Sequence, residues 1–256
     1  MEAYFAGGIM NFDEQIEALQ KMYDESKNIV FFGGAGVSTE SGIPDFRSQD
    51  GLYNQEWKYP PETIISRSFF DANPAEFYRF YRAKLIINGV KPNKAHIALA
   101  QMEKAGKLKA VVTQNIDGLH QMADSKTVFE LHGSTLRNFC MNCGTPYDID
   151  FIAKSADEPD GIPHCTKCGG KIKPDVVLYE ESLNDDIING AVKAISAADM
   201  LIIGGTSLVV YPAAGLVRYF GGKNLVLINK SQTAADSSAN LVIHESIGKV
   251  LGAIKI

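Results

Sequence analysis

The sequence predicts an α/β fold, in which a parallel sheet carries helices on both faces and a smaller lobe is attached. Short apolar runs typical of buried parallel strands recur along the chain, and each ends in a polar or glycine-containing loop. Four cysteines in two Cys-x-x-Cys pairs lie in a stretch rich in turn residues, which indicates a separate small module. We therefore expect a Rossmann-like large lobe and a smaller lobe with a four-cysteine zinc module and a helical insert.

The composition is that of a globular protein without a strongly charged surface. The net charge is −5, and hydrophobic residues make up 45% of the chain. Because surfaces that bind nucleic acid are usually basic, we expect no direct nucleic-acid partner. No apolar run reaches the ~20 residues that span a bilayer, and the N-terminus does not read as a signal peptide. We therefore expect a cytoplasmic protein with reduced thiols and no membrane partner. The oligomeric state stays open, and a monomer is compatible with the sequence.

The first elements are a helix and a strand. Residues 11–23 place apolar side chains on one helical face, and Asn11 with Glu14 has the pattern of a capping box. Residues 29–32 form a continuous apolar run, as expected for a strand that is buried on both faces.

The remaining elements follow the same alternation. We expect aromatic-rich helices broken by prolines in residues 49–95, and a further helix in residues 212–220. Buried strands are expected at residues 108–112, 200–203 and 225–228. Because ligands bind at the carboxyl ends of parallel strands, the residues that follow these strands should meet in one crevice.

The length and the order of these elements suggest one domain with two lobes. The large lobe would comprise residues 1–48, 93–133 and 174–256. The small lobe would combine a helical insert at residues 49–92 with the cysteine module at residues 134–173.

A glycine-rich turn follows the first strand. Gly33, Gly34 and Gly36 stand before small and hydroxylic residues, as expected where a helix begins. A strand, a glycine turn and a helix N-terminus together can bind a phosphate through free N–H groups. The alternative is a tight strand–helix turn without a ligand, because such a turn alone is a weak signal. The usual dinucleotide fingerprint is also incomplete, since Thr39 stands where its third glycine should be.

Six motifs cover most of the chain from residue 29 to about residue 247. They are Gly34-Ala-Gly-Val-Ser-Thr-Glu-Ser-Gly-Ile-Pro-Asp-Phe-Arg, Thr113-Gln-Asn-Ile-Asp-Gly-Leu-His, Leu131-His-Gly, the two Cys-x-x-Cys pairs, Gly205-Thr-Ser-Leu-Val-Val-Tyr-Pro-Ala and Ile228-Asn-Lys. In this order they resemble the signature of the sirtuins, the NAD-dependent protein deacylases. The resemblance implies NAD as cosubstrate, a structural zinc ion, and an acylated-lysine protein or peptide as substrate.

The resemblance also implies the catalytic residues. The histidine of the Leu-His-Gly motif is the general base of sirtuins, and His132 stands at that position. A group with a pKa near ~6.5 suits the removal of a proton from a ribose hydroxyl of NAD. Asn115 and Asp117 would line the nicotinamide and ribose pocket. Taken alone, a single histidine is more often structural, and polar residues after a strand often cap a turn. We interpret the following histidines as structural: His96, His120 and His244.

Further residues are implied to bind NAD. Phe46 would cover the nicotinamide site, and Arg47 would contact the phosphates or the leaving group. Residues near the ends of the later strands would surround the adenosine half. The complete predicted set is Gly34, Ala35, Gly36, Thr39, Phe46, Arg47, Gln114, Asn115, Ile116, Asp117, His132, Gly205, Thr206, Ser207, Asn229, Lys230 and Ile247.

The cysteines form two pairs, Cys140-x-x-Cys143 and Cys165-x-x-Cys168, with 21 residues between the pairs. This spacing is close to that of four-cysteine zinc sites, and four thiolates leave no open position on a tetrahedral ion. We therefore predict one structural zinc ion per chain. Two disulfides are the alternative, which the lack of a secretion signal disfavours. His164 is a further candidate ligand, although a histidine in such a place is more often simply exposed.

The protein substrate is expected to lie between the lobes as an added strand. Val176-Val-Leu-Tyr and Leu208-Val-Val-Tyr resemble the two sirtuin segments that pair with it. Glu180 departs from the family, which has glycine after the aromatic residue of the first segment, so the wall of the substrate site can differ here.

The acyl group is expected to be uncharged, with acetyl-lysine or another neutral acyl-lysine preferred over succinyl-lysine. Sirtuins that remove succinyl groups carry Tyr-x-x-Arg on a helix of the small lobe. The nearest match is Tyr78-Arg-Phe-Tyr81, which has tyrosine where that arginine should be, and Arg82 lies one place further on.

Three functions compete. A NAD-dependent lysine deacetylase would transfer the acyl group to the ADP-ribose of NAD and release nicotinamide. A protein ADP-ribosyltransferase could use the same fold, and a zinc-ribbon binding module would have no chemistry. The last alternative leaves Asn115, Asp117 and His132 unexplained, so we expect the first.

Overall fold

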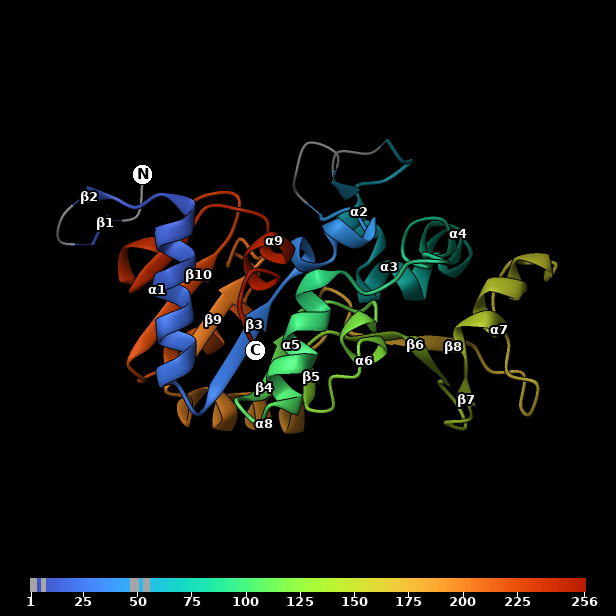
Figure 1. Ribbon diagram of the computed structural model, residues 1–256. Helices are drawn as coiled ribbons and strands as arrows, with labels where there is room; N and C mark the ends of the chain where they lie inside the picture. The colour runs from blue at the N-terminus through green and yellow to red at the C-terminus, as the bar shows by residue number, and fades with distance from the viewer. Residues whose placement is uncertain (1–3, 6–7, 47–50, 53–55) are drawn as a thin grey trace.

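Figure 1 shows the computed structural model of the chain, which describes residues 4–5, 8–46, 51–52 and 56–256. A six-stranded sheet is covered by helices, and a three-stranded sheet with its own helices lies to one side of it. A short antiparallel pair, β1 (Tyr4–Phe5) and β2 (Gly8–Ile9), precedes them. The predicted fold class is confirmed.

The large sheet is parallel throughout, with the strand order β11-β10-β9-β3-β4-β5. Its strands are β3 (Ile29–Gly33), β4 (Leu108–Thr113), β5 (Val128–Glu130), β9 (Met200–Gly204), β10 (Asn224–Ile228) and β11 (Leu241–Ile243). The chain builds β3, β4 and β5 in one direction and then returns to add the last three strands on the other side of β3. The strand order therefore reverses between β3 and β9, and ligands bind beside such a switch point in open α/β sheets.

Helices cover both faces of this sheet. One face packs against α1 (Phe12–Glu25), α5 (Lys94–Lys104) and α9 (Ile247–Leu251), through alternate strand residues such as Ile29 and Phe31. The other face packs against α8 (Asp185–Ser196) and the 3₁₀ helix η5 (Ala213–Tyr219), through Val30 and Phe32. Because successive side chains of a strand point to opposite faces, the apolar run of β3 is buried on both sides.

The smaller sheet is antiparallel, with β6 (Gly133–Cys140) between β7 (Pro146–Tyr147) and β8 (Ile172–Val176). The helices beside it are α2 (Pro61–Ile64), α3 (Arg67–Ala72), α4 (Pro74–Lys84) and α7 (Ile149–Lys154). Their aromatic side chains form a second core, in which the largest fully buried members are Phe70, Phe77, Phe80, Tyr78 and Tyr81. The prolines that break this stretch stand at helix starts, as Pro61 and Pro74 do.

Most predicted elements are confirmed. The first helix begins after Asn11, whose side chain accepts from the Glu14 N–H at 3.1 Å, while the Glu14 carboxylate accepts from the Asn11 N–H at 2.7 Å. The strands expected at residues 29–32, 108–112, 200–203 and 225–228 are present. The sequence reasoning missed β5, β11, α5 (Lys94–Lys104), α8 and the three-stranded sheet. The first two have three residues each, which is too short for a periodic pattern.

The helix expected to begin after the glycine turn is wrong. Two 3₁₀ turns, η1 (Ala35–Val37) and η2 (Thr39–Ser41), stand there instead of an α-helix. The N–H of Gly36 donates to the Gly205 carbonyl at 2.8 Å, so this N–H group bonds to the loop after β9. Gly42 follows with φ 88° and ends the second turn. The segment expected as a helix at residues 212–220 is likewise a 3₁₀ helix.

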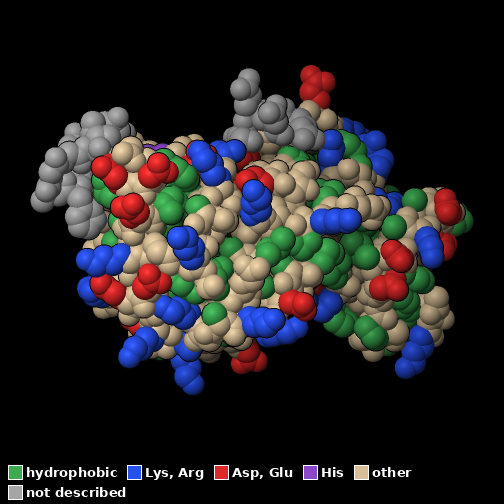
Figure 2. Space-filling model, viewed as in Figure 1, with side chains coloured by type: hydrophobic (Ala, Val, Ile, Leu, Met, Phe, Trp, Pro, Cys, Tyr) green, Lys and Arg blue, Asp and Glu red, His purple; other side chains and the backbone are tan. Residues whose placement is uncertain are grey.

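Acidic and basic side chains alternate over both parts of the molecule on the face shown in Figure 2. Within the described residues, no helix combines the length and the apolar character that crossing a membrane requires.

Candidate active site and cysteine centre

The loops that follow the strands of the large sheet meet at one edge. The Gln114 N–H donates to the Gly33 carbonyl at 3.0 Å, and the Gly34 N–H donates to the Gly204 carbonyl at 3.3 Å. The amide of the Gln114 side chain donates to the Thr206 hydroxyl at 3.1 Å. These bonds join the ends of β4, β3 and β9, so the structure brings these predicted residues together at the switch point.

Glycines allow the loops after β3 and β9 to touch. A Cβ on Gly36 would lie 2.8 Å from the Gly205 Cα, and one on Gly34 would lie 2.9 Å from the Thr206 Cβ. Gly205 has φ 59°, and a Cβ there would lie 2.4 Å from the Val37 nitrogen. These glycines therefore permit one backbone to pass another, in addition to any approach of a ligand.

A buried hydroxyl orients the two polar residues after β4. Ser38 donates to the Asp117 Oδ2 at 2.7 Å and accepts from the Asn115 Nδ2 at 3.1 Å. The other Asp117 oxygen accepts from the Leu119 N–H at 2.9 Å. Both oxygens of the carboxylate are thus held, and the side chain has one fixed orientation. Sequence reasoning missed Ser38, whose only signal was its place inside the glycine motif.

His132 follows β5, and its ring orientation is set by one hydrogen bond. Its Nδ1 lies 3.0 Å from the Gln114 carbonyl oxygen. Because a carbonyl only accepts, Nδ1 carries the proton and Nε2 keeps its lone pair. Burial lowers the pKa of His132, and the hydrogen bond to the carbonyl opposes this with a smaller effect. The half-buried ring is therefore neutral at pH 7 and able to accept a proton at Nε2.

Two further histidines, His96 and His120, are enclosed in the core. His96 and His120 are fully buried, and their ring centroids lie 4.7 Å apart. Burial, together with the neighbouring His96, lowers the pKa of His120 to about 3. His96 accepts from the Asn93 N–H at 3.2 Å and so caps α5. Both side chains stay neutral in the core, which agrees with a structural role.

The predicted residues on the adenosine side are more scattered. Asn229 follows β10, and its amide donates to the Ser231 carbonyl at 2.8 Å, while Ser207 and Lys230 are exposed. His244 connects the loops after β10 and β11, with its Nδ1 3.0 Å from the Asn229 carbonyl oxygen.

Three further predicted residues lie in or beneath the glycine turn. The Thr39 hydroxyl donates to the Gly36 carbonyl at 3.0 Å, and Ala35 is half-buried. Ile247 is 3% exposed, and its side chain belongs to the core beneath the end of β9. A contact between Ile247 and a ligand would therefore use its backbone.

Two further predicted residues reach toward the smaller lobe. Phe46 and Ile116 are partly buried and pack against the aromatic core of that lobe. Arg47, which was predicted to contact the phosphates or the leaving group, lies outside the described residues.

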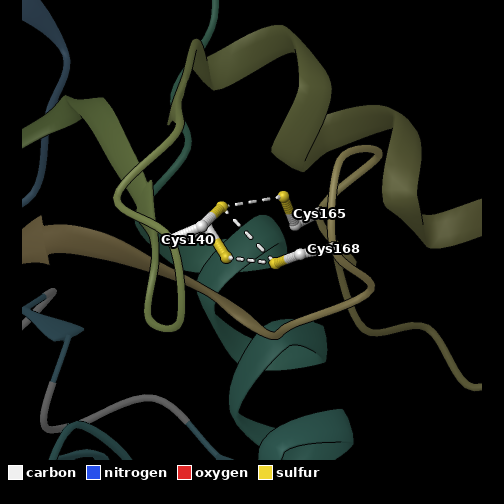
Figure 3. Close-up of side chains that lie close together, drawn as sticks. Cys140, Cys165 and Cys168 are labelled. Atoms are coloured by element: carbon white, nitrogen blue, oxygen red, sulfur yellow. Dashed lines mark hydrogen bonds between the residues drawn. The ribbon is translucent and has the colours of Figure 1, made fainter.

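The four cysteines converge as their spacing predicts. Their Sγ atoms all lie within 4.8 Å of one another, with 3.4 Å between Cys140 and Cys168 and 3.6 Å between Cys143 and Cys165. All four are free thiols, so the disulfide alternative is wrong. Figure 3 shows Cys140 at the end of β6 facing Cys165 and Cys168 across the site. Bonds of ~2.3 Å to a tetrahedral zinc ion place sulfurs ~3.8 Å apart, so this set fits one zinc ion.

The two cysteine turns have the same local structure. The Gly144 N–H donates to the Cys140 carbonyl at 2.9 Å, and the Gly169 N–H donates to the Cys165 carbonyl at 2.8 Å. Both glycines have positive φ, 70° and 71°, as the tight turns require. His164 is engaged elsewhere, with its Nε2 2.9 Å from the Asp160 carboxylate, so it is not a fifth ligand.

Arg82 connects the helical insert to the cysteine module. Its Nη1 donates to the Ser155 hydroxyl at 2.9 Å, and its Nη2 donates to the Gly161 carbonyl at 2.8 Å. The guanidinium, which the sequence left open as a partner for a charged acyl group, is therefore occupied within the smaller lobe.

Comparisons with known proteins agree with the resemblance. The sequence profile of the Sir2 family matches residues 34–212. The NAD-dependent protein deacetylase of Clostridium perfringens is 65% identical over 94% of this chain and 99% of its own length. The corresponding deacetylase of Clostridium acetobutylicum is 61% identical over 93% of this chain and 97% of its own length.

Solved structures give the same result. A Sir2 structure with a deacetylated p53 peptide and 3′-O-acetyl ADP ribose is 38% identical with a TM-score of 0.85, and covers 93% of this chain and 96% of its own. Sir2 bound to an acetylated peptide is 36% identical with a TM-score of 0.82, over 92% of this chain and 95% of its own. From its sequence, fold and arrangement of motifs, the chain belongs to the Sir2 family.

Proposed function

We propose that this protein is a NAD-dependent protein lysine deacetylase. The reaction transfers the acetyl group from a lysine side chain to the ADP-ribose part of NAD and releases nicotinamide. The observation that carries the proposal is the single orientation of His132, with a free Nε2 lone pair at the edge where the strand order reverses. The names of the relatives support the same reaction.

His132 is the general base in this proposal. Its Nε2 accepts the proton of a ribose hydroxyl, while Nδ1 keeps its hydrogen bond to the Gln114 carbonyl. Because burial lowers the pKa of His132, the imidazole is already neutral at physiological pH and no proton has to leave it first. Gln114 is fixed in turn by its hydrogen bond to Thr206, so the base is aligned through the backbone of the loop after β4.

Asn115 and Asp117 hold the nicotinamide half of NAD. The Asp117 carboxylate accepts from the nicotinamide amide, and Asn115 positions the ribose or a water molecule. Ser38 keeps both side chains in place before NAD arrives, since it bonds to each of them. Such preorganisation removes the need to order these groups during the reaction.

The donor set at this edge fits NAD. Amide, hydroxyl and carboxylate groups after β3, β4 and β9 provide hydrogen bonds for ribose and nicotinamide, and the polar residues after β9 and β10 provide them for the adenosine half. NAD itself supplies the glycosidic bond whose cleavage accompanies acyl transfer. The predicted set of NAD-binding residues is retained as part of this proposal.

The protein substrate adds a strand between the two segments that resemble the family's pairing segments. In the second segment, Val209 is 56% and Tyr211 is 69% exposed, so apolar side chains stand open beside the edge. Residues 176–179 form the facing wall. We also propose the two-lobe division with the ranges predicted above, and a zinc ion that is structural. Thiols that bind zinc stay reduced in the cytoplasm, where we place the protein.

Incubation of the zinc-loaded protein with NAD and an acetylated peptide tests the proposal. We expect free nicotinamide and deacetylated peptide in equal amounts, and no nicotinamide without the peptide. Label from NAD on protein instead would indicate an ADP-ribosyltransferase, and an absence of NAD turnover would leave a zinc-ribbon binding module.

A further inference from the structure

Glu180 has a backbone conformation that glutamate rarely adopts. Its φ is 75°, in the left-handed region where the Cβ of an L-residue crowds the following carbonyl oxygen. The family motif has glycine at this point, which takes this conformation without strain. Glu180 directly follows residues 176–179, the segment assigned to the peptide wall. A strained residue at this place needs something that holds it.

Ser68 holds the Glu180 carboxylate. The Ser68 N–H donates to Oε2 at 2.9 Å, and the Ser68 hydroxyl donates to Oε1 at 2.9 Å. Ser68 lies in the first turn of α3, where backbone N–H groups have no acceptor within the helix. The carboxylate supplies that acceptor and places a negative charge at the positive end of the helix. A glycine at position 180 would make neither bond.

The backbone of the same stretch is tied at two points. The Tyr179 N–H donates to the Ile65 carbonyl, and the Arg67 N–H donates to the Tyr179 carbonyl, both at 3.0 Å. Two residues earlier, the Val177 N–H donates to the carbonyl of His132 at 3.0 Å. The stretch therefore runs from the backbone of the proposed general base to the helical insert, and its shape depends on both.

The neighbouring Glu181 carboxylate has other partners than Ser68. Its carboxylate pairs with Arg67 at 3.0 Å and with Lys173 at 2.9 Å, and it accepts from the Leu178 N–H at 2.9 Å. It therefore cannot replace Glu180 at Ser68. Among the described residues, no hydrogen bond engages the Val177 carbonyl or the Glu180 N–H.

We propose that Glu180 is a positioning residue for the peptide substrate, because its two hydrogen bonds to Ser68 hold residues 177–180 in the shape that receives the peptide as an added strand. The inference rests on the proposed function. Glu180 contributes to the wall through its backbone and makes no contact with His132, so its loss affects peptide binding and leaves proton transfer intact. At the position where the family has glycine, this chain would thus use the two hydrogen bonds between the Glu180 carboxylate and Ser68, which we call the carboxylate latch.

Three variants test the latch: Glu180→Gly, Glu180→Gln and Ser68→Ala. Glu180→Gly keeps the backbone conformation without strain and loses both bonds, so we expect the peptide KM and the peptide Kd to rise about 5-fold. The kcat and the KM for NAD should stay within about 2-fold, since neither depends on the wall. Glu180→Gln keeps an acceptor for the Ser68 N–H and should lie between wild type and Glu180→Gly.

Ser68→Ala removes one of the two bonds, and we expect it to raise the peptide KM about 2-fold. The double variant should be no worse than Glu180→Gly alone, because both changes remove the same interaction. Ser182→Ala is the matched control, since Ser182 lies in the same turn and its side chain makes no hydrogen bond among the described residues. It should behave as wild type.

The peptide Kd, measured by fluorescence anisotropy with a labelled acetylated peptide, separates this inference from the proposed function. Peptide binding without nicotinamide release would contradict the proposed function. The ratio of the peptide Kd of Glu180→Gly to that of wild type would still show whether the latch exists. Wild-type Kd and KM in Glu180→Gly would overturn the latch, as would a loss of kcat at unchanged peptide KM. If Glu180→Gly fails to fold, the peptide Kd values of Ser68→Ala and Glu180→Gln relative to wild type provide the test instead.

Discussion

The cysteine centre and the active-site edge are assembled in different ways. The cysteine centre takes its four thiols from two turns within residues 140–168, and each turn is closed by the same local hydrogen bond. The edge takes its groups from loops that are far apart in the sequence and meet because their strands are parallel neighbours. Ser38 and Asp117, for example, are 79 residues apart and share a hydrogen bond of 2.7 Å.

The difference explains what each region contributes. Four cysteines fill a tetrahedral ion, so the centre can stabilise the smaller lobe and has no position for a substrate. The edge depends on the order of the strands for its geometry, and it holds His132, whose ring is oriented by the Gln114 carbonyl. We therefore expect changes in the first region to affect folding and changes in the second to affect chemistry.

Cys143→Ser should have the largest effect on stability, because it removes one of the four zinc ligands of the cysteine centre. Metal binding in such modules is coupled to folding, so zinc content should fall well below one ion per chain. The melting temperature should fall by about 10 °C or more, since a domain of this size loses about 2–4 °C per kcal/mol.

Zinc content and thermal melting measure this prediction. Met141→Ser is the matched control, because Met141 lies in the same turn, is 41% exposed and is no ligand. A zinc-free Cys143→Ser protein with normal stability would contradict a structural metal.

The preference for the acyl group should be a smaller effect than the loss of zinc. Arg82 is hydrogen-bonded to groups of the smaller lobe and is therefore not available to a succinyl carboxylate. Because burying an unpaired carboxylate is costly, kcat/KM on an acetyl-lysine peptide should exceed that on the succinyl peptide of the same sequence by about 10-fold or more. Arg82→Ala should leave this ratio unchanged. A preference for the succinyl peptide that disappears in Arg82→Ala would show that the arginine leaves its partners and binds the acyl group.

Ser38→Ala tests the active-site edge by removing a single hydroxyl group. Loss of the hydroxyl removes the bond to Asp117 and the bond from Asn115, and a hydrogen bond to a charged group is worth about 1.5–3 kcal/mol. We expect kcat/KM for NAD to fall about 10-fold, with zinc content unchanged. Ser41→Ala is the control, because Ser41 lies in the same motif and accepts only from Asn93. Equal rates for both variants would remove Ser38 from the site.

The two regions were not equally open to prediction from the sequence. The cysteine spacing predicted its centre directly, because ligands and turn glycines lie within a few residues of each other. The strands of the large sheet were also predictable, since burial on both faces leaves continuous apolar runs. Their order then placed Gln114 and Thr206 near each other through the rule for carboxyl ends.

Other features required the structure. A serine inside a turn motif carries no signal that it will reach Asn115 and Asp117, and a glycine motif does not tell whether an α-helix or 3₁₀ turns will follow it. The sequence showed that Glu180 departs from the family, but its partner Ser68 is 112 residues away. These contacts depend on tertiary packing, which local patterns do not encode.

The pH dependence should be the smallest effect and concerns the edge only. The base must be neutral, so kcat/KM falls as the pH drops through the pKa of His132. Because burial lowers this pKa below its usual value of 6.5, the midpoint of the acidic limb should lie below pH 6.5, and the rate should rise through this midpoint and level off toward neutral pH. A pH profile of kcat/KM checks this, and a midpoint above 6.5 would contradict a buried neutral base.

The most direct test of the account is the activity of His132→Ala measured together with its zinc content. We predict that peptide-dependent nicotinamide release and deacetylation fall by at least ~100-fold, the low end for removal of a general base. Zinc content and melting temperature should match those of wild type. His164→Ala, which removes a partly exposed histidine beside the cysteine centre, should keep full activity. Near-normal turnover in a folded, zinc-loaded His132→Ala protein would show that another group takes the proton.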